Sequence, residues 1–191
     1  MVDHHNRVIN YLRLSVTDRC NLRCFYCMPE EGVQFAPHSN ILTYEEMLRI
    51  VSLCIKRGIR KVRLTGGEPL VRQGIIGFIH KLNSLSDLEN IAITTNGVLL
   101  KEFAGDLWAN GINHINISMD TLKRDRFRHI TGRDAFDRVW EGIEEAESLG
   151  FNPIKINVVA MKGINDNEIL DFAKLTLEKP YHVRFIEMMP I

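Results

Sequence analysis

Residues 11–27, YLRLSVTDRCNLRCFYC, join a strand directly to a loop that contains three of the chain's four cysteines. Residues 11–17 alternate between apolar and polar side chains, which predicts a strand with one buried face. Further strands are predicted at 61–65, 90–95, 114–119, 153–160 and 182–188, with a helix between each pair. Parallel strands joined by helical crossovers form either a barrel or a doubly wound sheet.

The predicted helices extend over 43–58, 73–83, 100–110, 135–149 and 166–178. Thr43 and Glu46 form a capping box at the start of the first of them. Asn165 is predicted to cap the last helix, with Glu168 at its third position. Cys54, the fourth cysteine, lies on the apolar face of the first helix and is predicted to be a buried apolar side chain.

The clustered cysteines, Cys20, Cys24 and Cys27, have the spacing C-x3-C-x2-C, and no fourth cysteine lies near them in the sequence. Three thiolates on one loop can bind three irons of a cubane iron–sulfur cluster, whose complete ligation takes four cysteines. The remaining iron keeps an open coordination position, and such a position on a metal centre usually binds a reacting molecule. These three residues are therefore the predicted metal ligands.

Three alternatives stay open for this loop. A structural zinc site needs a fourth ligand, and the nearest histidine, His38, is eleven residues further along the chain. A disulfide would leave one thiol over. Cys24 and Cys27 alone match a thioredoxin-like redox motif, although Cys20 has no place in such a motif.

Composition excludes several classes of protein. The 191 residues carry 24 basic and 24 acidic side chains, so the net charge gives no basis for nucleic-acid binding. No run of about 18 apolar residues is present, and residues 1–7 are polar, so neither a membrane helix nor a secretory signal is expected. The chain is predicted to be one domain, residues 1–191, of a cytoplasmic protein whose cysteines stay reduced.

Alternation also assigns charged side chains to the face of the sheet that points away from the helices. The cations on this face are Arg13, Lys61, Arg63 and Lys155. Buried cations need either acidic partners, such as Asp120 and Glu187, or an anionic ligand. Since arginine and lysine bind phosphate oxygens well, the pattern favours a polyphosphate substrate.

Other conspicuous residues directly follow the predicted strands. They are Gly66-Gly67-Glu68-Pro69, Asn96-Gly97, Asp120 and Met188-Met189. In parallel α/β proteins the C-terminal ends of the strands meet at one edge, and this edge carries the active site.

The cysteine loop and the segment 66–69 resemble the radical S-adenosylmethionine (SAM) superfamily. Within it, the chain is similar to the GTP 3′,8-cyclase family of molybdenum-cofactor biosynthesis. The segments that carry this closer similarity are residues 11–21, 63–70, 163–166 and 184–187. The resemblance covers nearly the whole chain and implies a partial, open-sided (βα)6 barrel.

The resemblance also implies cofactors and site residues. Cys20, Cys24 and Cys27 would hold a [4Fe–4S] cluster whose open iron binds SAM, and the radical formed from SAM would abstract the 3′ hydrogen of GTP. The residues implied in SAM binding are Tyr26, Gly66, Gly67, Glu68, Ser118 and Met189. Those implied in GTP binding are Arg13, Arg63, Thr94 and Lys155, with Lys61 as a further cation.

Members of this family continue after the sixth strand into a region with a second cysteine triad and a second cluster, which these 191 residues do not contain. The chain is then either a truncated form or a short homologue, with exposed apolar surface at its C-terminal side. Two other functions remain alternatives: a radical SAM enzyme with another substrate, such as a peptide, and a catalytically silent metal- or nucleotide-binding module. The expected partners are GTP, a reducing electron donor, the downstream cyclic pyranopterin monophosphate synthase and a second copy of the chain.

Overall fold

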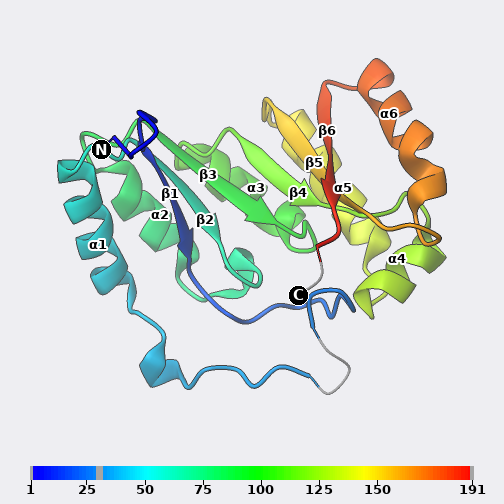
Figure 1. The fold of residues 1–191 in the computed structure, drawn as a ribbon, viewed down its shortest axis with the longest axis horizontal. Helices are drawn as coiled ribbons and strands as arrows, with labels where there is room; N and C mark the ends of the chain where they lie inside the picture. Colours follow the sequence, from blue (N-terminus) through cyan, green and yellow to red (C-terminus); the bar gives the residue numbers. More distant parts are fainter. Residues whose placement is uncertain (1, 29–31, 190–191) are drawn as a thin grey trace.

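A single sheet of six parallel strands organises the molecule in a computed structural model, which describes residues 2–28 and 32–189 (Figure 1). The strands pair in chain order: β1 (Tyr11–Ser15), β2 (Lys61–Thr65), β3 (Asn90–Thr95), β4 (Ile115–Ser118), β5 (Ile154–Ala160) and β6 (Tyr181–Glu187). β1 and β6 form the two ends of the sheet, so the described part of the chain does not close into a barrel. The prediction of a partial, open-sided (βα)6 barrel is confirmed.

Helices connect the strands, and α1, α2, α3 and α5 line one face of the sheet while α6 packs beside β6 (Figure 1). Their bounds are α1 (Tyr44–Lys56), α2 (Ile75–Asn83), α3 (Leu100–Ala109), α4 (Arg124–Thr131), α5 (Phe136–Ser148) and α6 (Ile169–Glu178). Short 3-10 helices lie at η1 (His38–Asn40), η2 (Pro69–Val71) and η3 (Asp166–Glu168). None of the helices in the described residues combines the length and the apolar character needed to cross a membrane.

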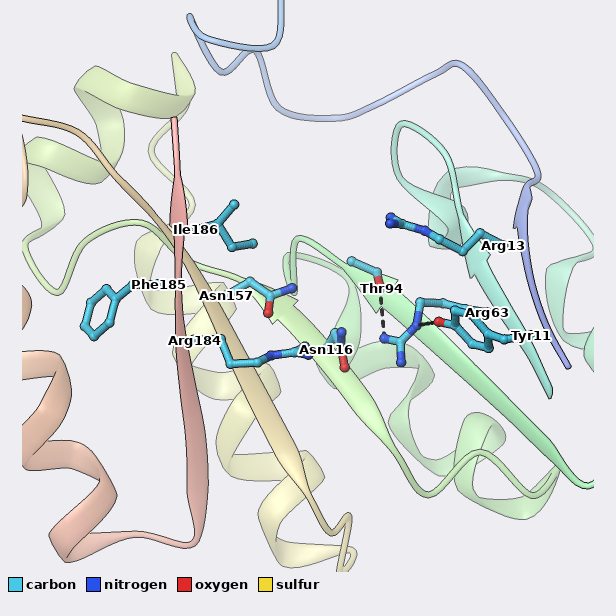
Figure 2. A pocket seen from close by; sticks show the side chains of 9 residues that line it. All are labelled: Tyr11, Arg13, Arg63, Thr94, Asn116, Asn157, Arg184, Phe185 and Ile186. Carbon is cyan, nitrogen blue, oxygen red and sulfur yellow. Dashed lines mark hydrogen bonds between the residues drawn. The ribbon is translucent and has the colours of Figure 1, made fainter. Parts of the chain in front are cut away.

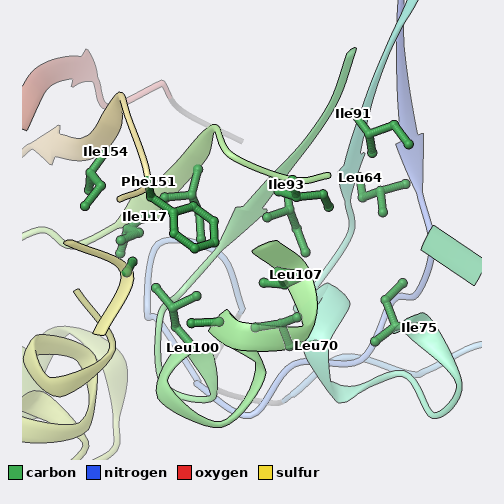
Figure 3. Close-up of a cluster of buried hydrophobic side chains, with 14 of the residues drawn as sticks. Leu64, Leu70, Ile75, Ile91, Ile93, Leu100, Leu107, Ile117, Phe151 and Ile154 are labelled. Atoms are coloured by element: carbon green, nitrogen blue, oxygen red, sulfur yellow. The ribbon is translucent and has the colours of Figure 1, made fainter. Parts of the chain in front are cut away.

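The hydrophobic core lies between the sheet and these helices (Figure 3). Leu64, Ile93 and Ile117 come from three neighbouring strands and are fully buried, as are Leu100 and Leu107 of α3. Burying a side chain of this kind contributes about 1.5–3 kcal/mol relative to leaving it exposed. Because one face of each strand is used in this way, the polar residues that alternate with them occupy the other face, as predicted.

The predicted capping box at the start of α1 is present. Thr43 N donates to Glu46 Oε2 at 2.7 Å, and Glu46 N donates to Thr43 Oγ1 at 3.2 Å. The second predicted cap is wrong, because the Asn165 side chain makes no capping hydrogen bond. Both Asn165 and Glu168 are buried and bond to the ends of neighbouring strands instead.

Two further local predictions needed correction. Cys54 is only half-buried, because it lies near the edge of the apolar face of α1. The helix α4 precedes the predicted helix over 135–149 and was not anticipated. Most of its residues are charged, and its only buried apolar side chains are Phe127 and Ile130. Two apolar positions are too few to show a helical periodicity.

Candidate active site

The cysteine loop leaves β1 at the C-terminal edge of the sheet and is held against α4. The main-chain amides of Arg23 and Phe25 donate to the carbonyl oxygens of Thr131 and Ile130, at 2.8 and 3.1 Å. These two bonds fix the middle of the loop against the last turn of a helix that lies more than 100 residues further along the chain.

The thiols of Cys20, Cys24 and Cys27 lie within electrostatic range of one another. Cys20 and Cys24 are half-buried, Cys27 is exposed, and none of the three is in a disulfide. Burial, followed by the charges of Asp120 and the other two cysteines, raises the pKa of Cys24 to about 12. Burial also raises the pKa of Cys20. The Cys20 and Cys24 thiols therefore keep their protons at neutral pH until a metal displaces them.

This donor set suits a cluster better than a single ion. Within the described ranges, no three His, Cys, Asp or Glu side chains come together as ligands of one metal ion. A cubane cluster makes a different demand, since each thiolate binds its own iron and the sulfurs stand apart by the width of the cluster. Three soft thiol donors on one loop, with Cys27 open to solvent, are the type of ligand that iron–sulfur clusters take.

Tyr26 ties the cysteine loop to the end of β4. Its hydroxyl donates to Asp120 Oδ2 at 2.6 Å, and Asp120 Oδ1 accepts from Val159 N of β5 at 2.8 Å. Asp120 is buried and fully engaged by these two donors. It therefore does not act as the acidic partner that the cations of the sheet were expected to find.

Gly66 and Gly67 are required by their contact with the root of the cysteine loop. A Cβ atom on Gly66 would lie 2.3 Å from Thr17 O, and one on Gly67 would lie 2.3 Å from Arg19 O. The main-chain amides of Gly67 and Glu68 donate to these same two carbonyl oxygens, at 2.8 Å each. The glycines thus set where the cysteine loop begins, and both remain exposed on their other side.

The carboxylate of Glu68 points into the protein. It accepts from Leu70 N at 3.0 Å, from Thr95 Oγ1 at 2.8 Å and from Asn96 N at 2.6 Å. Burial raises the pKa of Glu68, while the three donated hydrogen bonds lower it. Asn96 in turn donates to Cys20 Sγ at 3.6 Å. Glu68 therefore joins the ends of β2 and β3 next to a cysteine, and a direct role in binding SAM stays a prediction.

A pocket of about 380 Å³ lies on the polar face of the sheet, and all six strands contribute to its walls (Figure 2). Its lining residues are Tyr11, Arg13, Arg63, Thr94, Asn116, Asn157, Arg184, Phe185 and Ile186. Arg63 donates to Thr94 Oγ1 at 3.4 Å and to the hydroxyl of Tyr11. The volume is in the range of small-molecule sites, about 300–1,000 Å³.

The charges at this pocket are all positive. In the described part of the chain, no carboxylate lies within ion-pair distance of Arg13, Arg63, Lys155 or Arg184. Burial, followed by repulsion from Arg184 and Arg63, lowers the pKa of Lys155. Burial and Arg63 likewise lower the pKa of Arg184. Buried cations can be compensated by internal salt bridges or by an anionic ligand. The described residues form no such salt bridge with these cations, so an anionic ligand is the remaining way to compensate their charge.

The other predicted binding residues lie at different positions around the sheet. Lys155 is next to the pocket, with Asn116 and His182 as its partners on the adjacent strands. Ser118 ends β4, half-buried. Lys61 is exposed at the opposite, N-terminal end of β2, so it is not part of the pocket lining. Met189 is 72% exposed at the end of the described residues.

Six of the nine residues that line the pocket were not predicted as site residues, and two of them, Arg184 and Asn157, are polar residues of β6 and β5. Asn157 Oδ1 is buried and has no hydrogen-bond partner among the described residues. Arg184 approaches the pocket from β6, opposite Arg13 and Arg63 on β1 and β2 (Figure 2). The signal was available in both cases, because alternation along β5 and β6 places both residues on the inward face.

The sequence model of the Radical SAM superfamily matches residues 14–176. The chain belongs to the radical SAM superfamily. Two of its most similar curated relatives are GTP 3′,8-cyclases, that of Desulforamulus reducens at 56% identity and that of Petrotoga mobilis at 54%. Each match covers 100% of this chain and 59% of the relative. The structure of Streptococcus suis SuiB bound to S-adenosylmethionine has a TM-score of 0.73 at 20% identity, covering 95% of this chain and 40% of that chain.

As a radical SAM protein, the chain takes a [4Fe–4S] cluster and SAM as its cofactors. The structural likeness to SuiB, at 20% identity, supports the fold alone. The chain spans about 59% of the length of the curated relatives that it matches.

Proposed function

We propose that residues 1–191 form the radical SAM core domain of a GTP 3′,8-cyclase that acts in molybdenum-cofactor biosynthesis. Cys20, Cys24 and Cys27 would hold a [4Fe–4S] cluster, and this cluster would supply the electron for the cleavage of SAM into methionine and a 5′-deoxyadenosyl radical. The radical removes the ribose 3′ hydrogen of GTP, and the ribose carbon then bonds to C8 of guanine. Formation of this bond leaves an unpaired electron on the guanine ring. One further electron from the reducing partner and one proton would then give the product, (8S)-3′,8-cyclo-7,8-dihydroguanosine 5′-triphosphate.

The cation-lined pocket is the observation that carries this proposal. Arg13, Arg63 and Arg184 face one hollow, and no carboxylate of the described residues pairs with them. A triphosphate supplies the missing negative charge through charge-assisted hydrogen bonds. A peptide substrate offers no comparable density of charge, so the pocket favours a nucleotide. The names of the similar relatives point to GTP as that nucleotide.

At the C-terminal edge of the sheet, Cys20, Cys24 and Cys27 hold the cluster. The residues assigned to SAM are Tyr26, Gly66, Gly67, Glu68, Ser118 and Met189. Among them, the two glycines offer an exposed main chain without side chains, which permits close approach of a ligand. Glu68 and Tyr26 serve SAM by fixing the loops that surround it, because the carboxylate and the hydroxyl are already engaged within the protein.

On the inward face, Arg13, Arg63, Thr94 and Lys155 bind GTP. The first three line the pocket directly, and Lys155 is close enough to be repelled by two of its cations. A bound triphosphate relieves that repulsion and restores the proton affinity of the lysine. The contacts of these residues with the phosphates hold the nucleotide in place, so that its ribose is positioned for reaction with the radical.

The partners follow from the same proposal. A one-electron donor reduces the cluster, the cyclic pyranopterin monophosphate synthase takes the product, and the enzyme works in the cytoplasm. Exposed apolar side chains on β6 and beyond it support association with further protein, either a second copy or additional chain. They are Phe185, Ile186, Met188 and Met189, at 43%, 42%, 43% and 72% exposure.

Anaerobic reconstitution with iron and sulfide, followed by reduction in the presence of SAM, tests the proposal. We expect the native chain to load a cluster, to release 5′-deoxyadenosine and to bind GTP, and the Cys24→Ser variant to lose the first two properties. Zinc loading without SAM cleavage would overturn the proposal. SAM cleavage without measurable GTP binding would instead assign the chain to a radical SAM enzyme with another substrate.

A further inference from the structure

The segment 163–168, between β5 and α6, makes contacts that the proposed reaction does not use. Asn165 is 3% exposed, and its Nδ2 donates to Asp120 O at 2.7 Å and to Val159 O at 2.8 Å. Its Oδ1 accepts from Met161 N at 2.7 Å. One side chain thus links the ends of β4 and β5 through three main-chain groups.

Glu168 makes a second link from the same segment. Its side chain is fully buried and accepts from Thr121 Oγ1 at 2.8 Å and from Leu122 N at 2.7 Å. Arg126 forms an ion pair with it from α4. Glu168 therefore fixes the two residues that come directly after Asp120.

Asp120 is the point at which these links meet the cysteine loop. Its main chain is held by Asn165, and the residues that follow it are held by Glu168. Its carboxylate receives the Tyr26 hydroxyl at 2.6 Å and Val159 N at 2.8 Å. A shift of the Asp120 main chain would therefore move the carboxylate oxygen that accepts the hydrogen bond of Tyr26. Tyr26 lies between Cys24 and Cys27 in the sequence, so the loop would move with it.

We propose that Asn165 and Glu168 are positioning residues that act on the cysteine loop through Asp120 and Tyr26. The consequence for catalysis rests on the proposed function, in which this loop holds the cluster. Buried polar and charged groups seldom stabilise a fold more than apolar side chains of similar volume do. Here their hydrogen bonds, together with the main chain of residues 120–122, form one path from Asn165 and Glu168 to the loop, and this path gives the loop a defined orientation.

Hydrogen–deuterium exchange of the 191-residue chain without cofactors tests this inference. We expect Asn165→Ala and Tyr26→Phe each to speed exchange of the loop amides, residues 23–28, roughly five- to tenfold, the factor that loss of about one net hydrogen bond implies. The double variant is expected to exchange no faster than the faster single variant, because both changes break the same path. The control is Asp166→Ala, which removes only an exposed bond to Gly163 N and leaves the loop unchanged.

Unchanged loop exchange in both single variants would overturn the inference. Equal acceleration throughout the sheet and helices, or additive effects in the double variant, would also overturn it, since either result shows a general loss of stability. Glu168→Gln keeps the side-chain shape and provides a second probe if Asn165→Ala does not fold. Electron paramagnetic resonance of the reduced cluster extends the test, because addition of SAM is expected to change the spectrum. This change should be weaker in Asn165→Ala than in Asp166→Ala. Failure of cluster loading would overturn the proposed function, while the exchange result would still decide the inference.

Discussion

Replacing Lys155 by methionine should stabilise the chain and weaken nucleotide binding at the same time. Lys155 is half-buried, and burial together with Arg184 and Arg63 lowers its pKa. Its neighbours in register, Asn116 and His182, supply no negative charge. Methionine has a similar length, fills the same space and carries no charge, so Lys155→Met removes the repulsion without opening a cavity.

The magnitudes of the two effects differ. Repulsion between partly solvated charges costs about 0.2–1 kcal/mol per pair, so two such pairs predict a gain of about 1 kcal/mol for Lys155→Met. For a chain of this length that gain raises Tm by roughly 2–4 °C. A charge-assisted hydrogen bond to phosphate is worth about 1.5–3 kcal/mol, so the affinity for GTP should fall roughly 10- to 100-fold.

The pH dependence of stability provides an independent check. The pKa of Lys155 is lower in the folded chain than its ordinary value of 10.5, so the folded chain loses this proton first as the pH rises. Between the two values the unfolded chain binds more protons, and the stability of the native chain therefore rises with pH. The advantage of Lys155→Met should shrink over this window, because the native lysine has then lost its charge as well.

Thermal unfolding and equilibrium binding of GTP measure these effects, with Lys56→Met as the matched control. Lys56 is exposed at the end of α1, away from the pocket, so the same substitution there should leave the affinity for GTP unchanged. A Lys155→Met variant that is less stable than the native chain would refute the charge repulsion inferred here. Unchanged GTP affinity would remove Lys155 from the binding site.

Three further changes test other parts of the site. Cys24→Ser should abolish the absorbance of the reconstituted cluster, whereas Cys54→Ser should leave it unchanged, as measured by iron content and visible spectra. Gly67→Ala should cost about 1–3 kcal/mol in urea unfolding, because its Cβ would lie 2.3 Å from a main-chain oxygen; Gly77→Ala, in α2 with no atom within 4 Å, should be neutral or stabilising. Glu68→Gln should destabilise the chain by about 1–3 kcal/mol. Both carboxylate oxygens of Glu68 accept buried hydrogen bonds, and the NH2 group of glutamine would place a donor against a donor at one of these positions. A wild-type unfolding curve for either destabilised variant would count against the packing described for that loop.

Much of the fold could be predicted from periodicity. Strands such as β2 and β4 alternate strictly, so both their positions and their inward faces were identified from sequence. The helix α4 was missed because its residues are mostly charged and it is stabilised by tertiary contacts with α5 and with the cysteine loop rather than by its own pattern. Local capping rules likewise failed at Asn165, where main-chain groups of β4 and β5 compete for the side chain.

The candidate site was predictable to the extent that its residues carry distinctive spacing or charge. The cysteine triad and the inward cations Arg13 and Arg63 belong to this group. The inward orientation of the Glu68 carboxylate depends on two donors, Thr95 at the end of β3 and Asn96 directly after it, which are 27 and 28 residues away and which no local pattern reveals. The bond between Tyr26 and Asp120 spans 94 residues and could not be anticipated without the fold.

The most direct test of the proposed function is the fate of the 3′ hydrogen of GTP. The reconstituted, reduced chain is incubated with SAM and GTP deuterated at the ribose 3′ carbon, and the 5′-deoxyadenosine is analysed by mass spectrometry. We expect 5′-deoxyadenosine that carries one deuterium from GTP. Unlabelled 5′-deoxyadenosine formed at the same rate with and without GTP would contradict it.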